Sequence, residues 1–341
     1  MSTLYQSSLS KMEKLIKKLA EIYPLKITKS LGKVAGGYLS DNFAVGNEDE
    51  KYFLRQYRAK YTRSEIEAIH RVKKFFAENG IPIILPLRTK KGETFFEFGN
   101  RFYALFPFVE EKTIEASNLA DNSIKSIGLM LAKIHLLSKN GFPNLTEERT
   151  SEFNKEKCLK IGEEIKEIVD NIKNPTNFDK IAQRQVSYKI DLIKNNQIKF
   201  YDLGLKYDHL IHGDFHALNL FYDENGEVKY VYDFEKAVVS PRSFEIARAI
   251  DYICLENFDP ENVKKARIFI SAYRSIYPIS NDEIKIGLRF WYLKNIHSFW
   301  IEEAHYLNKN FRTDVFYPIQ DRKLKYYSKN FDQMIKNILE D

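Results

Sequence analysis

The chain has 341 residues, 44% of them hydrophobic, which is more than one average domain and enough to bury a sizeable core. Its net charge of +6 is diffuse, and in stretches such as residues 155–173 lysines alternate with glutamates, a pattern typical of solvated surfaces, so nucleic acid is not an expected partner. No run of about 18 apolar residues occurs, which excludes a membrane-spanning helix, and the two distant cysteines, Cys158 and Cys254, predict a reducing cytoplasm without disulfides.

The first part of the chain is predicted to be a helix followed by strands. In residues 1–23 apolar side chains recur at helical spacing, and the lysines between them exclude a secretory signal, so we expect an amphipathic helix that packs on the protein. Residues 27–57 resemble three strands, with a loop at Gly36 and Gly37 between the first two. This glycine pair fits either an ordinary hairpin turn or a loop whose N–H groups bind phosphate.

A second helix is expected in residues 63–79. Its apolar positions recur at helical spacing: Ile66, Ile69, Val72 and Phe76. An apolar strand follows at 101–109, and from there the chain is mainly helical. The order of elements predicts an α+β fold, with a small antiparallel β-sheet in residues 1–108 and a larger, mainly helical part in residues 109–341.

The most informative stretch is His-Gly-Asp-Phe-His-Ala-Leu-Asn at 212–219. If it forms a tight loop, Asp214 and Asn219 can converge on one point, whereas an extended run would separate them by roughly 16 Å. A turn and a strand then lead to Asp233-Phe-Glu. A carboxylate that faces an attacking hydroxyl, with oxygen ligands for Mg²⁺ nearby, is what a phosphoryl-transfer site needs. We therefore expect Asp214 to face the hydroxyl, and Asn219 and Asp233 to bind the metal.

A structural interpretation of the same residues is a loop aspartate that caps a helix beside a buried histidine. The ordered set of loop Asp, Asn, strand and Asp-Phe-Glu favours the chemical interpretation. For His216 both loop packing and contact with substrate remain open.

These motifs resemble those of the aminoglycoside phosphotransferase and choline kinase superfamily of small-molecule kinases. The resemblance implies a two-lobed, protein-kinase-like fold that binds ATP (or GTP) with Mg²⁺ and transfers phosphate to a hydroxyl of a small molecule. It implies that Asp214 is the catalytic base or orients the hydroxyl, and that Asn219 and Asp233 are metal ligands. Glu245 and Arg248, in the helix that follows, are implied to brace the catalytic loop.

The resemblance also assigns residues of the first lobe to the nucleotide. The basic residue of the third strand, which binds phosphates, matches Arg55 in place of the more usual Lys; Arg remains charged and can bind bidentately. Its partner should be a glutamate of the following helix, either Glu65 or Glu67, and we favour Glu67.

The glycine loop is the second nucleotide element that the resemblance implies. Gly36 and Gly37 would lie over the phosphates, with Ser40 as a polar candidate, although the spacing departs from the family pattern. The strand 101–109 would form the hinge between the lobes, with adenine bound by backbone groups.

The acceptor site is the least specified by sequence. A helical run around Trp300 and Glu303 mixes aromatic and acidic side chains, which suits an ammonium or amino-sugar substrate, although simple core packing is the alternative. His216 and Glu235 complete our candidates. An aminoglycoside, choline, homoserine and an uncharged sugar all remain open.

The expected function is thus a small-molecule kinase with no obligate protein partner. A non-catalytic binding or assembly protein on the same fold is the alternative. A protein kinase is disfavoured, because Asp-Phe-Glu at 233–235 is not followed by an Ala-Pro-Glu activation segment.

Overall fold

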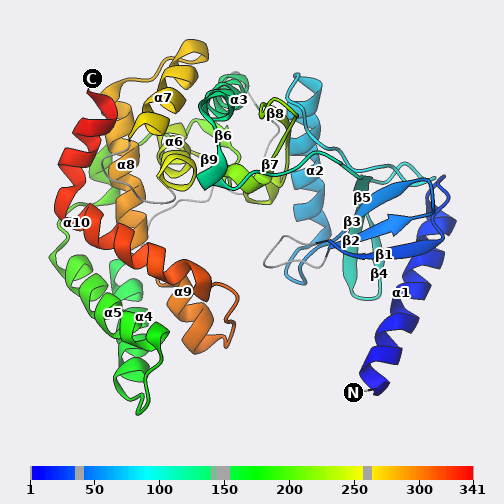
Figure 1. The fold of residues 1–341 in the computed structure, drawn as a ribbon, viewed down its shortest axis with the longest axis horizontal. Helices are drawn as coiled ribbons and strands as arrows, with labels where there is room; N and C mark the ends of the chain where they lie inside the picture. Colours follow the sequence, from blue (N-terminus) through cyan, green and yellow to red (C-terminus); the bar gives the residue numbers. More distant parts are fainter. Residues whose placement is uncertain (1, 35–41, 140–141, 143–153, 256–262, 341) are drawn as a thin grey trace. The chain divides into compact units, whose positions relative to one another are not determined.

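A computed structural model describes residues 2–34, 42–139, 142, 154–255 and 263–340 of the protein (Figure 1). The chain forms two compact units: unit 1 comprises Met1–Lys112 with Tyr230–Phe234, and unit 2 comprises Thr113–Lys229 with Glu235–Asp341. The division falls at Lys112, where the sequence predicted residue 108. The assignment of Tyr230–Phe234 to unit 1 was not foreseen.

Unit 1 is built on a five-stranded antiparallel sheet with the strand order β1-β2-β3-β5-β4. The strands are β1 (Lys29–Lys33), β2 (Asn42–Gly46), β3 (Lys51–Gln56), β4 (Phe96–Phe98) and β5 (Arg101–Pro107), and the helices are α1 (Ser2–Ile22) and α2 (Arg63–Glu78). The three strands and two helices predicted for this region are therefore confirmed. The predicted loop residues Gly36, Gly37 and Ser40 lie outside the described residues.

Neighbouring residues of the central strands face opposite sides of the sheet, as the pleat requires. Leu54 of β3 and Leu105 of β5 face α1 and pack with Leu15. Their successors, Arg55 and Phe106, face the other side; α2 approaches Phe106 there through a lysine. Arg55 is thus held on the most central strand of the sheet.

The start of α2 is fixed by a capping box. The Thr62 hydroxyl accepts a hydrogen bond from the Glu65 backbone N–H, and the Glu65 carboxylate accepts one from the Thr62 backbone N–H at 2.6 Å. The apolar stripe predicted for this helix is buried: Ile66, Ile69, Val72 and Phe76. The carboxylate of Glu65 is therefore used within its own helix.

Unit 2 is mainly helical, with two small two-stranded sheets, β6-β9 and β7-β8. Its longer helices are α3 (Asp121–Lys139), α4 (Lys155–Asp170), α5 (Asn177–Asn195), α6 (Arg242–Ala249), α7 (Lys264–Ile276), α8 (Asn281–Ile296) and α10 (Tyr317–Leu339). Its strands are β6 (His209–Ile211), β7 (Leu220–Tyr222), β8 (Val228–Val231) and β9 (Val238–Ser240). The shorter elements are the 3-10 turns η1 (Ala116–Asn118), η2 (Phe200–Leu203), η3 (Ala217–Asn219), η4 (Phe234–Lys236) and η7 (Asp314–Phe316), the π-helical turns η5 (Ile250–Cys254) and η6 (Glu303–Leu307), and α9 (Trp300–Glu302). β8 and η4 run across the division between the units.

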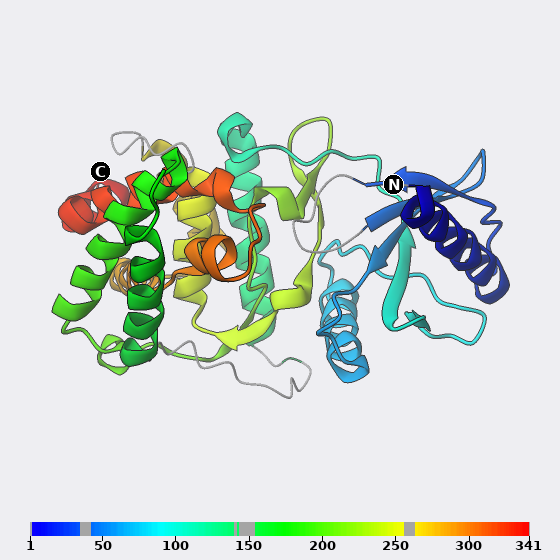
Figure 2. The same cartoon turned by 90° about the horizontal axis from the view of Figure 1, so that it is seen from below.

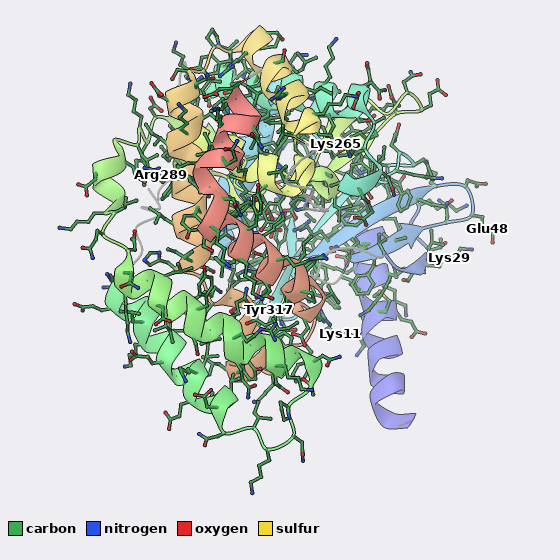
Figure 3. All side chains as sticks on the ribbon, turned by 60° about the vertical axis from the view of Figure 1, so that its left-hand side comes forward. Lys11, Lys29, Glu48, Lys265, Arg289 and Tyr317 are labelled. Carbon is green, nitrogen blue, oxygen red and sulfur yellow. The ribbon has the colours of Figure 1, made fainter. Side chains whose placement is uncertain are left out.

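The helical pair α4 and α5 shares a core with the segment around α9 (Figure 2). Ile165 and Val186 pack there with Tyr306 and Tyr317. Tyr317, labelled in Figure 3, begins α10, and its hydroxyl donates to Glu302 Oε1 at 3.0 Å. The described part of the chain contains no helix with the length and apolarity needed to span a membrane.

Close contact between α6 and α8 depends on a glycine. A Cβ atom on Gly287 of α8 would lie 2.2 Å from the carbonyl oxygen of Ser243 in α6. Because α6 carries Glu245 and Arg248, this approach sets the place of both side chains.

We predict that Gly287→Ala destabilises the protein by about 1–3 kcal/mol, because a backbone must move to admit the methyl group. The matched control is Gly162→Ala in α4, where the nearest atom is the end of the Phe299 ring. A side chain and not a backbone must shift there, and alanine favours the helix by about 1 kcal/mol over glycine, so the control should lose less. Urea unfolding measures both, and equal stabilities would contradict the prediction.

Candidate active site

The loop after β6 turns sharply at Gly213, which has φ 77°. A Cβ atom there would lie 1.9 Å from the carbonyl oxygen of Lys236. Only glycine combines this conformation with this approach. The glycine of His-Gly-Asp therefore lets the backbone at Lys236 lie directly against the loop that follows β6. β6, which ends just before this loop, pairs with β9, which begins just after Lys236.

A buried carboxylate organises the same loop from behind. Glu245 accepts hydrogen bonds from the backbone N–H groups of His212 at 2.9 Å and Gly213 at 2.5 Å. His135 of α3 donates to it through Nε2 at 3.0 Å, and the Tyr273 hydroxyl lies 2.9 Å from His135 Nδ1. Burial opposes the charge of Glu245, but these hydrogen bonds and the nearby histidines outweigh it and lower its pKa. The bracing position that the resemblance implied for Glu245 is the one observed.

Asp214 lies in a cationic environment. Arg248 donates to its Oδ1 and to the carbonyl oxygen of Gly213, and Lys236 Nζ lies 2.8 Å from its Oδ2. Burial raises the pKa of this carboxyl, but Arg248, Lys236 and His216 lower it by more, so that its pKa lies well below the usual range. Asp214 is thus held as a carboxylate, with a cation on each oxygen.

His216 is near this carboxylate without a close bond to it. Its Nε2 lies 4.0 Å from Asp214 Oδ1, and its ring faces Tyr252 at 6.5 Å. Burial lowers the pKa of His216 to about 4, and Arg248 acts in the same direction, although Asp214 opposes them. The imidazole is therefore neutral at pH 7 and brings no charge to the site.

Asn219 closes the loop, as the tight-loop hypothesis predicted. Its amide nitrogen donates to the carbonyl oxygen of Asp214 at 2.8 Å, and the residue is buried. Because the amide nitrogen is used in this bond, the amide oxygen of Asn219 is the atom of this side chain that suits a hard cation.

Asp233 belongs to unit 1 and is held by Arg55. Both carboxylate oxygens lie 3.2 Å from Arg55 Nη2, and Arg55 Nη1 donates to the Tyr232 hydroxyl at 2.5 Å. The backbone of Asp233 has φ 62°, an uncommon value outside glycine. Val231 N–H donates to the carbonyl oxygen of Pro82 at 2.9 Å, which ties the segment to unit 1.

The predicted partner of Arg55 was wrong. Glu67 is exposed on α2, and Glu65 serves the capping box, whereas the carboxylate bound to Arg55 is that of Asp233. On its sheet-facing side α2 instead buries Lys73, whose Nζ lies 4.7 Å from the centre of the Phe106 ring and 5.4 Å from that of Tyr232. The spacing of Lys73 from Ile66 and Ile69 placed it on the apolar stripe, a signal that we overlooked.

The donor atoms of Asn219 in unit 2 and of Asp233 in unit 1 are each chemically suited to Mg²⁺. Within the residues that the structure describes, no three Asp, Glu, His or Cys side chains gather as a preformed metal cluster. Mg²⁺ is commonly held by one or two carboxylates together with substrate phosphates and water. The side-chain oxygens of Asn219 and Asp233 are ligands of that kind.

The residues predicted to contact the acceptor differ in exposure and in charge. Trp300 is 42% exposed and lies near Phe316, with the ring centres 6.4 Å apart. Glu303 is half-buried, and burial together with Glu302 raises its pKa. Glu235 is half-buried in η4. Trp291 of α8, in contrast to Trp300, is buried against Phe244 and Tyr252.

A small polar pocket lies beside Trp300, with a volume of about 20 Å³, room for a water molecule. Side chains from α5, η5, α9 and α10 line it, among them Gln185, Lys189, Asp251, Glu302 and Lys323. Lys189 is paired with Glu302 at 2.9 Å and Lys323 with Asp251 at 3.1 Å. Two acidic groups of this region, Glu302 and Asp251, are therefore paired with buried lysines.

We predict that Glu245→Gln destabilises the protein by about 1–3 kcal/mol, because an amide N–H₂ would face a backbone donor. The lowered pKa of Glu245 means that its contribution is present above its ordinary value of 4.5 and is lost as the pH falls through the native value. The variant should accordingly lose less stability than wild type on acidification from pH 5. Urea unfolding between pH 3 and 7 tests this, with the exposed Glu227→Gln as control; parallel curves for Glu245→Gln and wild type would refute it.

Comparison with known proteins agrees with this geometry. The model of the phosphotransferase enzyme family matches residues 30–279. A homoserine kinase of Phenylobacterium zucineum (strain HLK1) is 22% identical over 271 residues, 80% of this chain and 78% of the relative. An aminoglycoside phosphotransferase of Alicyclobacillus acidocaldarius has a TM-score of 0.63 at 13% identity, covering 94% of this chain and 96% of the other. A spectinomycin phosphotransferase solved with ADP and spectinomycin has a TM-score of 0.58 at 16% identity, covering 92% and 93%. The likenesses to solved structures confirm the protein-kinase-like α+β fold, and the family match shows that the chain belongs to the phosphotransferase enzyme family and is a small-molecule kinase.

Proposed function

We propose that the protein transfers the γ-phosphoryl group of ATP (or GTP), in the presence of Mg²⁺, to a hydroxyl of a small molecule. The observation that carries the proposal is the geometry of Asp214: a carboxylate on a loop fixed by Glu245, kept ionised by Arg248 and Lys236. Such a group can orient a hydroxyl and accept its proton late in the transfer, when the oxygen has become acidic.

The other assigned residues act on the nucleotide. Asn219 and Asp233 hold Mg²⁺, which neutralises charge on the phosphates, and Arg55 binds the phosphates that are not transferred. The glycine loop at Gly36 and Gly37, with Ser40, covers the phosphates. Catalysis rests on positioning and electrostatic stabilisation rather than on a covalent enzyme intermediate.

We infer that the acceptor is a small hydroxyl compound with an amine and not a polycation. Two acidic side chains near Trp300, Glu302 and Asp251, are paired internally with Lys189 and Lys323. A polycation would need unpaired carboxylates, whereas a compound of balanced charge would not. Homoserine, the acceptor named for the curated relative, is of this kind. His216, Glu235, Trp300 and Glu303 remain our acceptor-side candidates.

The direct test is Mg²⁺-dependent release of ADP or GDP with homoserine, choline, spectinomycin, aminoglycosides and common sugars as acceptors. We expect release with one acceptor class and a product heavier by one phosphate. Asp214→Asn should lower kcat by about 100-fold or more, while Asp191→Asn, an exposed control on α5, should not. Mg²⁺-nucleotide binding without turnover on any hydroxyl compound would favour the non-catalytic alternative.

Replacing Arg55 should change nucleotide binding and Mg²⁺ binding in opposite directions. In the nucleotide-free protein Arg55 neutralises the carboxylate of Asp233. Phosphates that attract Arg55 would release this carboxylate for Mg²⁺, so binding of the nucleotide and binding of Mg²⁺ should strengthen each other. Arg55→Met should weaken ADP binding by about 10- to 100-fold, and should strengthen binding of Mg²⁺ alone.

Calorimetric titration of Mg²⁺ and ADP, separately and together, measures both effects. The control is Arg58→Met, which removes a half-buried arginine of the same unit that stacks on Tyr61. Weaker Mg²⁺ binding in the Arg55 variant would contradict the proposed exchange of partners.

A further inference from the structure

We propose that Lys236 is a catalytic residue that contacts the phosphoryl group during its transfer, while its ammonium stays hydrogen-bonded to Asp214. The proposal rests on the kinase function proposed above and adds to it a residue outside the motifs from which that function was inferred. Lys236 directly follows Asp233-Phe-Glu235 in the sequence, yet its side chain lies against the other motif, His-Gly-Asp.

The backbone anchors Lys236 to the catalytic loop. Its carbonyl oxygen occupies the space that a side chain at Gly213 would fill. Two residues later the chain pairs with β6, where Val238 lies opposite Ile211. The place of Lys236 beside Asp214 is therefore set by strand register and by a glycine contact, and does not depend on the attraction between the two charges.

The two cations on Asp214 differ in their freedom. The Arg248 side chain is 11% exposed, donates to the loop carbonyl of Gly213 as well as to Asp214, and lies against the Tyr252 ring at 5.3 Å. The Lys236 side chain is 54% exposed, and Asp214 is its one salt-bridge partner in the described part of the chain. Arg248 is thus committed to holding the loop, whereas Lys236 can bind a second anion from the solvent side.

The second anion is the γ-phosphate. A hydroxyl bonded to Asp214 lies about 2.7 Å from the carboxylate oxygen, and the phosphorus that it attacks lies about 3–3.5 Å farther on. Lys236 Nζ lies 2.8 Å from Asp214 Oδ2, and its exposed, flexible side chain can bring it within hydrogen-bonding distance of the oxygens on that phosphorus. Its three N–H donors allow it to keep Asp214 and bind phosphoryl oxygens at once.

The charge balance of the step favours this role. The bond from the acceptor oxygen to phosphorus forms, the bond from phosphorus to the bridging oxygen breaks, and the nucleoside diphosphate leaves with the electron pair. The hydroxyl proton passes to Asp214, and Lys236 keeps its own. Negative charge is spread over the phosphoryl oxygens in the transition state, and His216, being neutral, cannot offset it. Lys236 supplies the positive charge on the acceptor side of the phosphorus.

The test compares binding of Mg²⁺-ADP with binding of Mg²⁺-ADP-aluminium fluoride, a stand-in for the phosphoryl group in transfer, by calorimetry. Lys236→Met should bind Mg²⁺-ADP like wild type but lose about 10- to 100-fold of the tightening that aluminium fluoride gives. Lys236→Arg should restore part of it. Lys206→Met, which replaces an exposed lysine of unit 2, is the matched control and should behave like wild type.

The outcomes separate the two proposals. Full tightening in Lys236→Met, or no tightening in wild type that binds Mg²⁺-ADP, would overturn the role of Lys236 and leave the kinase function standing. A wild-type protein that binds no Mg²⁺-ADP would overturn the kinase function itself. Because Lys236 is exposed, the variant should fold, and its Mg²⁺-ADP affinity reports that it has.

Discussion

The buried carboxylate of Glu245 is the interaction on which the candidate site depends. It accepts two consecutive backbone N–H groups of the loop and a histidine N–H from α3, so three parts of unit 2 meet at one charge. A single buried carboxylate costs free energy unless its lone pairs are satisfied. Here the lone pairs of Glu245 accept these three hydrogen bonds, and the loop that donates two of them is thereby held in place. The loop that carries Asp214 is thus held in place because its N–H groups supply the hydrogen bonds that the buried Glu245 needs.

Each of the two functional aspartates is held by an arginine of its own unit. Arg248 binds Asp214 in unit 2, and Arg55 binds Asp233 in unit 1. The consequences differ, because Arg248 is also tied to a loop carbonyl and a ring, while Asp233 would have to exchange Arg55 for a metal. Under the proposed function, the first pair would keep Asp214 charged, and the second pair would hold the charge of Asp233 until phosphates bind Arg55. The same ion-pair chemistry would then serve positioning in one unit and coupling in the other.

Sequence predicted most of what depends on local pattern. The strands and helices of unit 1, the close approach of Asn219 to the Asp214 loop and the bracing by Glu245 all follow from periodicity or motif. The carboxylate that pairs with Arg55, that of Asp233, was not predicted. This pair forms because Tyr230–Phe234 belongs to unit 1, and its two residues are far apart in sequence. Lys236 was overlooked for the same reason: its contact with Asp214 exists only through the Gly213 backbone approach.

Under the proposed function, the charges of unit 2 also bear on which acceptor would bind. Lys189 and Lys323 neutralise the carboxylates nearest Trp300, and Lys236 and Arg248 exceed the charge of Asp214 beside them. A polycation would lie beside lysines where it needs carboxylates, so no ion pairs would offset the free energy that its desolvation costs. A small hydroxyl compound that carries one amine and one acid would find both signs within reach. Selectivity in this protein would then arise from buried lysines that exclude the wrong acceptor as much as from groups that attract the right one.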